Sequence, residues 1–275
     1  MDKNKHAQKS IDSATRVMLT KAEKDSVEVA WDRFKKQEPQ CGFGLLGICC
    51  RNCNMGPCRI DPFGNGPDKG VCGATAATIV ARNLLRAIAA GAAAHSDHGR
   101  DIVETLLHAA EGKAPDYEVK DKEKLLALAG EFNVSTDGRS EKEIAAEIAR
   151  RALDEFGTGK GNLDFLGRLP SQRKEKWSKL GIVPRGIDRE IVEIMHRTHM
   201  GVDTDYVNLI LHGLRAALSD GWGGSMWATE LSDVLFGTPK PHRGMSNLGV
   251  LQEDEVNIIV HGHEPTLSEM IVRAA

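Results

Sequence analysis

The sequence predicts a mainly α-helical domain over residues 1–245, followed by the first strand and helix of a parallel α/β, Rossmann-like domain over residues 246–275. Apolar residues recur at helical spacing through most of the first domain. One loop rich in cysteine, glycine and proline, residues 41–73, interrupts that pattern. Near the end of the chain, a continuous run of β-branched residues and a glycine turn precede a last helical segment.

The N-terminal part is predicted to form two short helices. Ser10 can cap a helix that starts at Ile11, and residues 27–37 have the pattern of a second, amphipathic helix that Pro39 ends. The loop over residues 41–73 then holds three prolines and many glycines besides its cysteines. This composition favours a loop that wraps around a ligand over a segment that packs on itself.

From residue 74 onward the chain becomes alanine-rich, and its apolar residues, among them Ile79, Leu84 and Ile88, recur at roughly helical spacing. This pattern predicts a long helical segment that ends before Pro115. Gly91 is one position at which the segment could divide into two helices, and Gly99 is the other. The small side chains would allow another element to approach it closely.

The second half of the chain is predicted to contain further helices. A capping box formed by Ser140 and Glu143 opens a helix that runs to Phe156. Helices are also predicted over residues 171–180, 187–199, 203–220 and 228–237, with a glycine-rich break at residues 221–225. Residues 255–265 predict a strand and a turn, and residues 266–275 a helix. Because a lone strand cannot bury both of its faces, more chain is expected after Ala275.

Composition excludes several classes of protein. The chain of 275 residues is 41% hydrophobic and 27% charged, which predicts a sizeable core instead of disorder. Its net charge of -3 argues against general binding to nucleic acid or to a membrane surface. The polar N-terminus lacks the apolar core of a signal peptide, and no apolar run is long enough to predict a transmembrane span. A cytoplasmic, reducing setting is expected, where clustered cysteines favour metal binding over disulfides.

All six cysteines lie between positions 41 and 72. Four of them have the number and closeness of a thiolate cage, with the spacing Cys-x2-Cys-x4-Cys-x13-Cys: Cys50, Cys53, Cys58 and Cys72. A structural zinc site usually presents two short Cys or His pairs, whereas this stretch has one Cys-x2-Cys pair and no histidine. The spacing therefore favours a 4Fe–4S cluster, with zinc and inert buried thiols as the alternatives. Arg59 is a candidate counter-charge for such a cluster, or one half of an ordinary surface ion pair.

The remaining two cysteines, Cys41 and Cys49, are two ligands short of a second cage. Two copies of the chain related by a two-fold axis would supply four thiolates between them, so a homodimer could hold a shared cluster. The alternative is that these two cysteines are free or structural. The spacing alone leaves both possibilities open.

Several motifs resemble those of one family, the catalytic subunit of anaerobic nickel–iron carbon monoxide dehydrogenase: CGFGLLGICCRNCNMGPCRIDPFG, KGVCGATAATIVARNLLRAIAAGAAAHSDH, EIMHRTHMGVD, DVLFGTP, NLGVL and VNIIVHGHEP. The resemblance runs in order from about residue 10 to the end of the chain, over roughly the N-terminal two-fifths of the family's usual length. It implies a homodimeric oxidoreductase that interconverts CO and CO2, releasing two protons and two electrons per CO oxidised with water. It also implies a ferredoxin-like electron carrier.

The resemblance further implies the roles of the cysteines. The four cysteines of the cage would hold a 4Fe–4S cluster that relays electrons within one subunit. Cys41 and Cys49 would pair with their copies in a second subunit to hold a bridging iron–sulfur cluster. The remaining cysteines of the active site and the family's catalytic lysine would lie beyond residue 275, so this chain would carry only part of the ligand set.

The resemblance assigns three histidines to the active site. His261 would ligate the unique iron of the nickel–iron–sulfur active-site cluster. His95 would lie near the bound CO or CO2 and assist proton transfer, and His98 would continue a ladder of histidines. The sequence departs from the ladder at Asp101, a carboxylate that can still relay protons. Without the resemblance, these histidines would more often be structural.

A second interpretation, from a different class, is a non-catalytic iron–sulfur module for electron transfer or dimerisation. It follows from the missing part of the active-site ligand set. Iron and sulfide without nickel or CO oxidation would support this module, whereas all of them together would support the enzyme.

Overall fold

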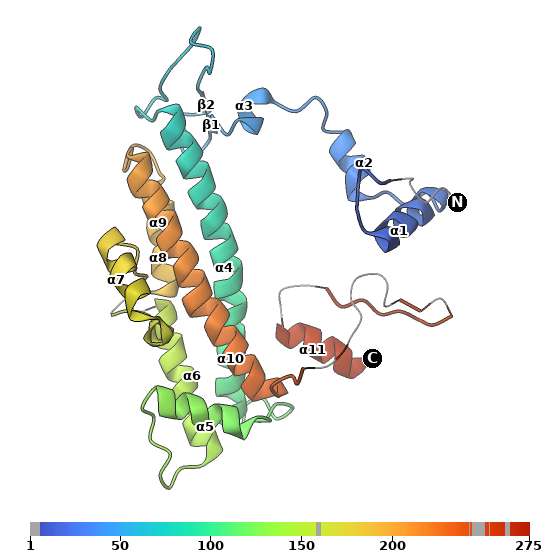
Figure 1. The fold of residues 1–275 in the computed structure, drawn as a ribbon, viewed down its shortest axis with the longest axis vertical. Helices are drawn as coiled ribbons and strands as arrows, with labels where there is room; N and C mark the ends of the chain where they lie inside the picture. Colours follow the sequence, from blue (N-terminus) through green and yellow to red (C-terminus); the bar gives the residue numbers. More distant parts are fainter. Residues whose placement is uncertain (1–5, 158–160, 242, 244–250, 253, 262–264) are drawn as a thin grey trace. The chain divides into compact units, whose positions relative to one another are not determined.

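The computed structural model describes residues 6–157, 161–241, 243, 251–252, 254–261 and 265–275 (Figure 1). The chain forms two compact units, which are described separately. The first unit comprises Met1–Leu45 and Lys240–Ile259, and the second comprises Leu46–Pro239 and Val260–Ala275. The domain boundary predicted near residue 245 stays a prediction.

The first unit contains three short helices: α1 (Ser13–Lys24), α2 (Ala30–Lys35) and α3 (Gly42–Leu45). The start predicted for the first helix is corrected by two residues. The Asp12 carboxylate, not the Ser10 hydroxyl, caps α1 and accepts a hydrogen bond from the Thr15 backbone N–H at 2.6 Å. Ser10 Oγ accepts instead from the Asp12 N–H at 3.1 Å. Two good capping residues lie within one turn, and the carboxylate is the one that reaches the helix end.

The second unit is built on one long helix, α4 (Ala76–Ala110), which is unbroken at both glycines where a break was considered. Gly99 serves close packing instead. A Cβ atom there would lie 2.7 Å from the carbonyl oxygen of Gly224. Among the described helices, α4 alone is long and apolar enough to cross a membrane. A bundle's core helix passes the same test, and α4 packs against the four helices α6, α8, α9 and α10.

Shorter helices follow α4 along the chain. They are α5 (Lys122–Glu131), α6 (Glu141–Gly157), the short 3-10 helix η1 (Asp164–Arg168), α7 (Ser171–Leu180) and α8 (Ile187–Arg197). The capping box predicted for α6 is present. The Ser140 N–H donates to Glu143 Oε2 at 2.8 Å, and the Glu143 N–H donates to Ser140 Oγ at 3.3 Å. Helix α5 was not predicted, although Asp121 caps it by accepting from the Lys124 N–H at 2.9 Å.

The break predicted at residues 221–225 is wrong. Helix α9 (Tyr206–Ser219), a π-helical turn η2 (Asp220–Gly224) and helix α10 (Ser225–Phe236) form one continuous rod beside α4 (Figure 1). Close packing explains the glycines of this turn. A Cβ atom at Gly223 would lie 2.6 Å from Ile187, and one at Gly224 would lie 3.3 Å from the backbone of Ser96. The glycines allow a π-helical turn, in which each backbone hydrogen bond spans one residue more than in an α-helix, and the helix continues through it.

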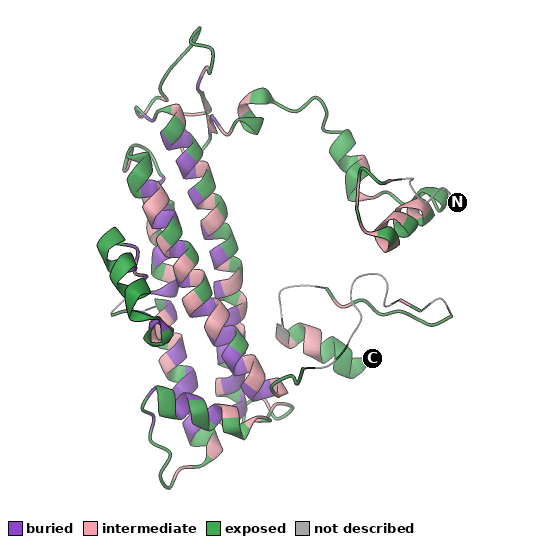
Figure 2. Cartoon of the chain, in the orientation of Figure 1, coloured by how far each residue is buried: buried purple, intermediate pink, exposed green. Residues whose placement is uncertain are grey.

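The core of the second unit consists of two clusters of buried side chains along α4 (Figure 2). The larger cluster includes the aromatic rings of Phe132, Phe165 and Trp227, whose centroids lie 4.6 to 5.2 Å apart. The smaller cluster joins Leu85 of α4 to Leu209 of α9. The mainly helical class predicted from the sequence is therefore confirmed.

The sequence predicts a strand and a turn over residues 255–265, but residues 255–261 form no strand, and residues 262–264 lie outside the described residues. A strand needs a hydrogen-bonded neighbour, and the sheet found among the described residues is the two-stranded one in the cysteine loop. Helix α11 (Pro265–Ala274) does form, as predicted. The Rossmann-like arrangement is not confirmed.

Glu155 on α6 makes the stability of this unit depend on pH. Burial raises the pKa of Glu155 to about 7, although Trp227 Nε1 (at 2.8 Å) and the Asp164 N–H both donate to its carboxylate. The folded protein therefore holds a proton that the unfolded chain releases near pH 4.5. The free energy of unfolding should fall by roughly 3 kcal/mol as the pH rises through this window.

The decrease in the free energy of unfolding with rising pH should disappear in Glu155→Gln. It should persist in Glu123→Gln, a control at an exposed position of α5. Urea unfolding at about pH 5 and about pH 8 measures it. Equal pH dependence in all three proteins would contradict the assignment.

Candidate metal centre

The first half of the cysteine loop is a tight hairpin. Strand β1 (Cys49–Cys50) pairs with strand β2 (Cys58–Arg59) in antiparallel fashion, so that Cys50 lies opposite Cys58. The return between the strands passes close to β1. A Cβ atom at Gly56 would lie 2.9 Å from the Cys50 carbonyl oxygen. Only glycine fits there, and its presence lets Cys53 lie on the same short loop as the paired strands.

The second half of the loop turns back onto this hairpin. The Gly70 N–H donates to the Ala74 carbonyl at 2.8 Å, which closes a turn that contains Cys72. The Val71 N–H points to Cys58 Sγ at 3.5 Å. As a result, four cysteines line one pocket: Cys50, Cys53, Cys58 and Cys72. The structure thus brings together the four cysteines that the spacing singled out.

The thiols of this pocket are spread more widely than ligands of a single ion. Among the described residues, the only three or more metal-binding atoms that all lie within 4.8 Å of one another belong to Glu190, Glu193 and His212. Thiolates around one zinc ion lie closer than this, since each Zn–S bond is only about 2.3 Å long. A 4Fe–4S cube is a larger object and holds its four thiolates further apart. The pocket geometry therefore suits a cluster.

A buried arginine, which the sequence reading missed, also faces the pocket. Arg82 of α4 is 1% exposed, and its Nη1 lies 3.5 Å from Cys72 Sγ. Burial raises the pKa of the Cys72 thiol, but Arg82 and backbone N–H groups outweigh burial and lower it overall. Arg59, the counter-charge considered from the sequence, is exposed. The signal for Arg82 was an arginine on the apolar side of an alanine-rich helix, three residues after Ile79.

The other two cysteines belong to different units. Cys49, half-buried, lies on β1 in the second unit, where Asn83 Nδ2 of α4 donates to the Gly47 and Cys49 carbonyls at 2.9 and 3.2 Å. Cys41 is exposed and precedes α3 in the first unit. The shared cage predicted from this pair stays a prediction.

His95 and His98 lie one turn apart on α4, with ring centroids 5.3 Å apart. His95 Nδ1 lies 2.9 Å from Oδ1 of Asp220, the first residue of the π-helical turn. Asp101 follows at the same three-residue spacing, and its Oδ2 is buried without a hydrogen-bond partner among the described residues. The sequence did not single out Asp220, because it lies 125 residues from His95 along the chain.

His261 is exposed in a segment without secondary structure. Within the described ranges, it does not line the cysteine pocket, and no hydrogen bond joins it to His95. Its predicted role as an iron ligand stays a prediction.

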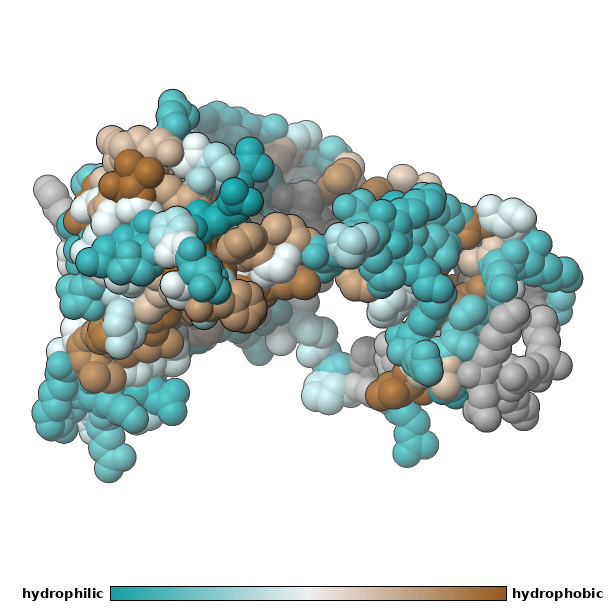
Figure 3. All heavy atoms as spheres, turned by 90° about the horizontal axis from the view of Figure 1, so that it is seen from above, coloured by the Kyte–Doolittle hydropathy of each residue, from teal (hydrophilic) through white to brown (hydrophobic). Residues whose placement is uncertain are grey.

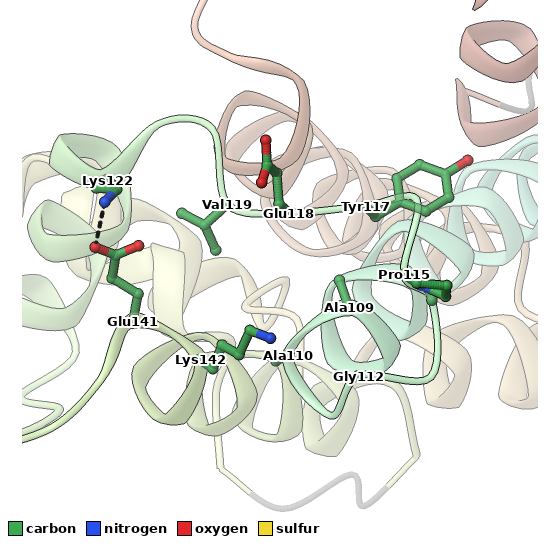
Figure 4. Close-up of a pocket in the computed structure, with 11 residues that line it drawn as sticks. Ala109, Ala110, Gly112, Pro115, Tyr117, Glu118, Val119, Lys122, Glu141 and Lys142 are labelled. Carbon is green, nitrogen blue, oxygen red and sulfur yellow. Dashed lines mark ion pairs between the residues drawn. The ribbon is translucent and has the colours of Figure 1, made fainter.

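Two other groups of residues in the second unit resemble binding sites but contain no cysteine. Glu190, Glu193 and His212 resemble a cation site, but Arg185 and Arg215 already neutralise the two carboxylates. A surface pocket near the C-terminal end of α4 is lined by residues such as Tyr117 and the ion pair Lys122–Glu141 (2.7 Å), and by no cysteine or histidine (Figure 4). This pocket and the cysteine pocket lie at opposite ends of α4, which is about 50 Å long.

A helical bundle with a four-thiol pocket has the donor set of proteins that bind metals through thiolates. The chain belongs to the Prismane/CO dehydrogenase family, whose family model matches residues 48–275. It is 63% identical over 268 residues to carbon monoxide dehydrogenase 1 of Methanosarcina mazei, covering 98% of this chain and 43% of that protein. The chain thus spans less than half the length of this curated relative.

Solved structures show the same likeness. The nickel-free carbon monoxide dehydrogenase of Thermococcus sp. AM4, 58% identical, superposes with a TM-score of 0.88 over 94% of this chain and 41% of that one. A structure of acetyl-CoA synthase/carbon monoxide dehydrogenase with NiZn[Fe4S4] and NiNi[Fe4S4] clusters, 45% identical, also has a TM-score of 0.88. It covers all of this chain and 40% of that one.

Proposed function

We propose that this chain supplies the electron relay, part of the proton relay and one active-site ligand of a carbon monoxide dehydrogenase. The reaction is CO + H2O to CO2 with two protons and two electrons, and a ferredoxin-like carrier takes up the electrons. The observation that carries the proposal is the pocket lined by four cysteines at the start of α4, in a chain of this family. The same helix carries the His95–Asp220 pair.

The pocket fits a 4Fe–4S cluster held by Cys50, Cys53, Cys58 and Cys72. All four thiols line this one pocket, and a Cβ atom at Gly56 or Gly70 would crowd the Cys50 carbonyl oxygen or the Cys58 side chain. The Val71 N–H already points at one sulfur, the kind of contact that tunes thiolate clusters. These residues would hold the cluster that passes electrons onward.

A homodimer would complete a second cluster from Cys41 and Cys49 of each chain. The cysteine loop of the second unit leaves several large apolar side chains exposed in the single chain: Leu46, Met55, Phe63 and Val71. Figure 3 shows apolar surface among hydrophilic surface on the face seen from above. One chain supplies only two of the four thiolates that a cluster needs. The exposed apolar side chains of the cysteine loop support the proposal that a second copy of the chain binds at this loop.

His95 is built to accept a proton at one defined atom. The Asp220 carboxylate only accepts hydrogen bonds, so at 2.9 Å from it Nδ1 of His95 donates, and in the neutral ring the lone pair lies on Nε2. His98 is the next titratable group along the helix face, and Asp101 the one after it. A nickel–iron–sulfur cluster, to which His261 would contribute one ligand, would supply the CO and CO2 redox chemistry when bound. The other ligands would come from outside these 275 residues.

Anaerobic reconstitution with iron and sulfide tests the proposal. The chain should gain iron, acid-labile sulfide and broad visible absorbance, and Cys58→Ser should lower the iron content by about four atoms per chain. Asn54→Ser, an exposed change in the same loop, is the control and should keep the iron. Colourless protein that binds zinc and no iron would refute the proposal. Iron and sulfide without CO oxidation, in a preparation that is loaded with nickel and supplied with the remaining active-site ligands, would support the electron-transfer module.

A further inference from the structure

Arg82 stands out among the arginines of the second unit because it is buried without a carboxylate partner. Apart from Arg86, which is only partly buried and contacts Thr198 Oγ1 and the Met195 carbonyl, the partly buried arginines of this unit pair with acids, among them Arg100 with Asp188, Arg151 with Asp164, Arg168 with Glu131 and Glu230, Arg185 and Arg215 with Glu190, and Arg197 with Asp203. Arg82 is in no such ion pair within the described part of the chain. Its Nε is buried and has no hydrogen-bond partner there. A buried, unpaired guanidinium is costly, so an anion is expected beside it.

The anion that the structure offers is the thiolate pocket. Arg82 lines the pocket together with the four cysteines, and its Nη1 lies 3.5 Å from Cys72 Sγ. Its Nη2 donates to the Asp203 carbonyl at 2.8 Å, while the Asp203 carboxylate is taken by Arg197. The neutral carbonyl holds the guanidinium in place, and the sulfur is left as the charge partner.

The loop between α8 and α9 fixes this position. Thr78, one turn before Arg82 on α4, donates its hydroxyl to the Thr204 carbonyl at 2.7 Å. Gly201 of the same loop lies against Cys72, since an added Cβ atom there would lie in van der Waals contact, 3.6 Å from the Cys72 Cβ. The loop therefore holds Arg82 and Cys72 together, and the charge sits at a fixed distance from the sulfur.

We propose that Arg82 is a positioning residue that acts through the Cys72 thiolate and raises the reduction potential of the four-cysteine cluster. The inference rests on the proposed function of those cysteines. Reduction adds one electron to the cage, supplied here by a chemical reductant of low potential, and no bond breaks. The added negative charge is stabilised by a nearby positive charge and by an N–H donor to sulfur, so both favour the reduced form.

The test is a redox titration, followed by electron paramagnetic resonance, of the anaerobically reconstituted chain and four variants. The signal of the cage is assigned by its loss in Cys58→Ser. Arg82→Gln removes the charge and should shift the midpoint potential negative, with the equilibrium constant for reduction falling about tenfold, or about 59 mV. Arg82→Lys keeps the charge and should recover most of this shift. Arg86→Gln, one turn further along α4, contacts Thr198 instead of the cage and should leave the potential unchanged.

Iron content and thermal unfolding are measured on every sample. A normal iron content in Arg82→Gln with a wild-type potential would overturn the proposal. Loss of iron from both Arg82→Gln and Arg82→Lys would assign the arginine a purely structural role and overturn it as well. Failure of the unaltered chain to bind iron is a different result, because it contradicts the proposed function of the cysteines.

Discussion

Replacing Glu190 with glutamine is expected to lower the free energy of unfolding by about 3 to 5 kcal/mol, since it removes one partner of a buried ionic network. Glu190 is 0% exposed. Arg185 donates to both of its oxygens at 3.0 Å, and Arg215 Nε donates at 2.7 Å. Nε2 of His212 lies 3.1 Å away. A neutral amide would leave these donors short of one negative charge around a side chain that is fully buried.

Glu193→Gln is the matched control for this change. Glu193 contacts the same two arginines, but its side chain is 30% exposed, so its loss should cost only about 1 kcal/mol. Urea unfolding at neutral pH compares the two variants. A cost for Glu190→Gln no larger than that for Glu193→Gln would show that burial of the network is not what makes it strong.

The same network makes the stability of the folded protein depend on pH in the acid range. Burial opposes ionisation of Glu190, but its partners outweigh burial and hold the pKa of this carboxyl well below its ordinary value of 4.5. The folded protein therefore stays ionised where the unfolded chain takes up a proton. The stability from Glu190 is full above about pH 4.5 and is lost as the pH falls below it. The difference between the unaltered protein and Glu190→Gln should shrink accordingly in acid.

The parts of the site that the sequence could predict are those whose partners are close along the chain. Cys50, Cys53 and Cys58 lie within nine residues, so their spacing alone indicated a shared pocket. The capping box of Ser140 and Glu143 is equally local and was right. Where two local signals competed, as Ser10 and Asp12 did, the boundary moved by two residues.

The parts that failed depend on neighbours far away in the sequence. The π-helical turn persists because Gly223 and Gly224 fit against Ile187 and α4, contacts that no local pattern reveals. Asp220 meets His95 across 125 residues. The apolar run over residues 255–261 has the composition of a strand, but composition cannot supply the neighbouring strand that it needs.

In a preparation of this protein that oxidises CO, His95→Gln is expected to slow turnover by about 10²- to 10⁴-fold, the contribution of a positioned acid or base. Asp220→Asn is expected to slow it by about 10- to 100-fold, the usual cost of losing a partner that orients a functional histidine. Turnover and the visible spectrum of the clusters are measured together. Both variants should keep the visible spectrum of the four-cysteine cluster. His95 lies about 20 Å along α4 from Arg82, the residue that faces the cysteine pocket.

The asparagine variant separates orientation from simple packing. Its amide has nearly the shape of the carboxylate, but it can turn its N–H2 group toward Nδ1 of His95. The ring proton then moves to Nε2, and the acceptor that the proposed relay needs is lost while the fold stays intact. Asp97→Asn, on the exposed side of the same helix, changes the same charge without touching the ring and should turn over normally. If Asp220→Asn turned over as fast as Asp97→Asn, the tautomer of His95 would play no part in moving the proton.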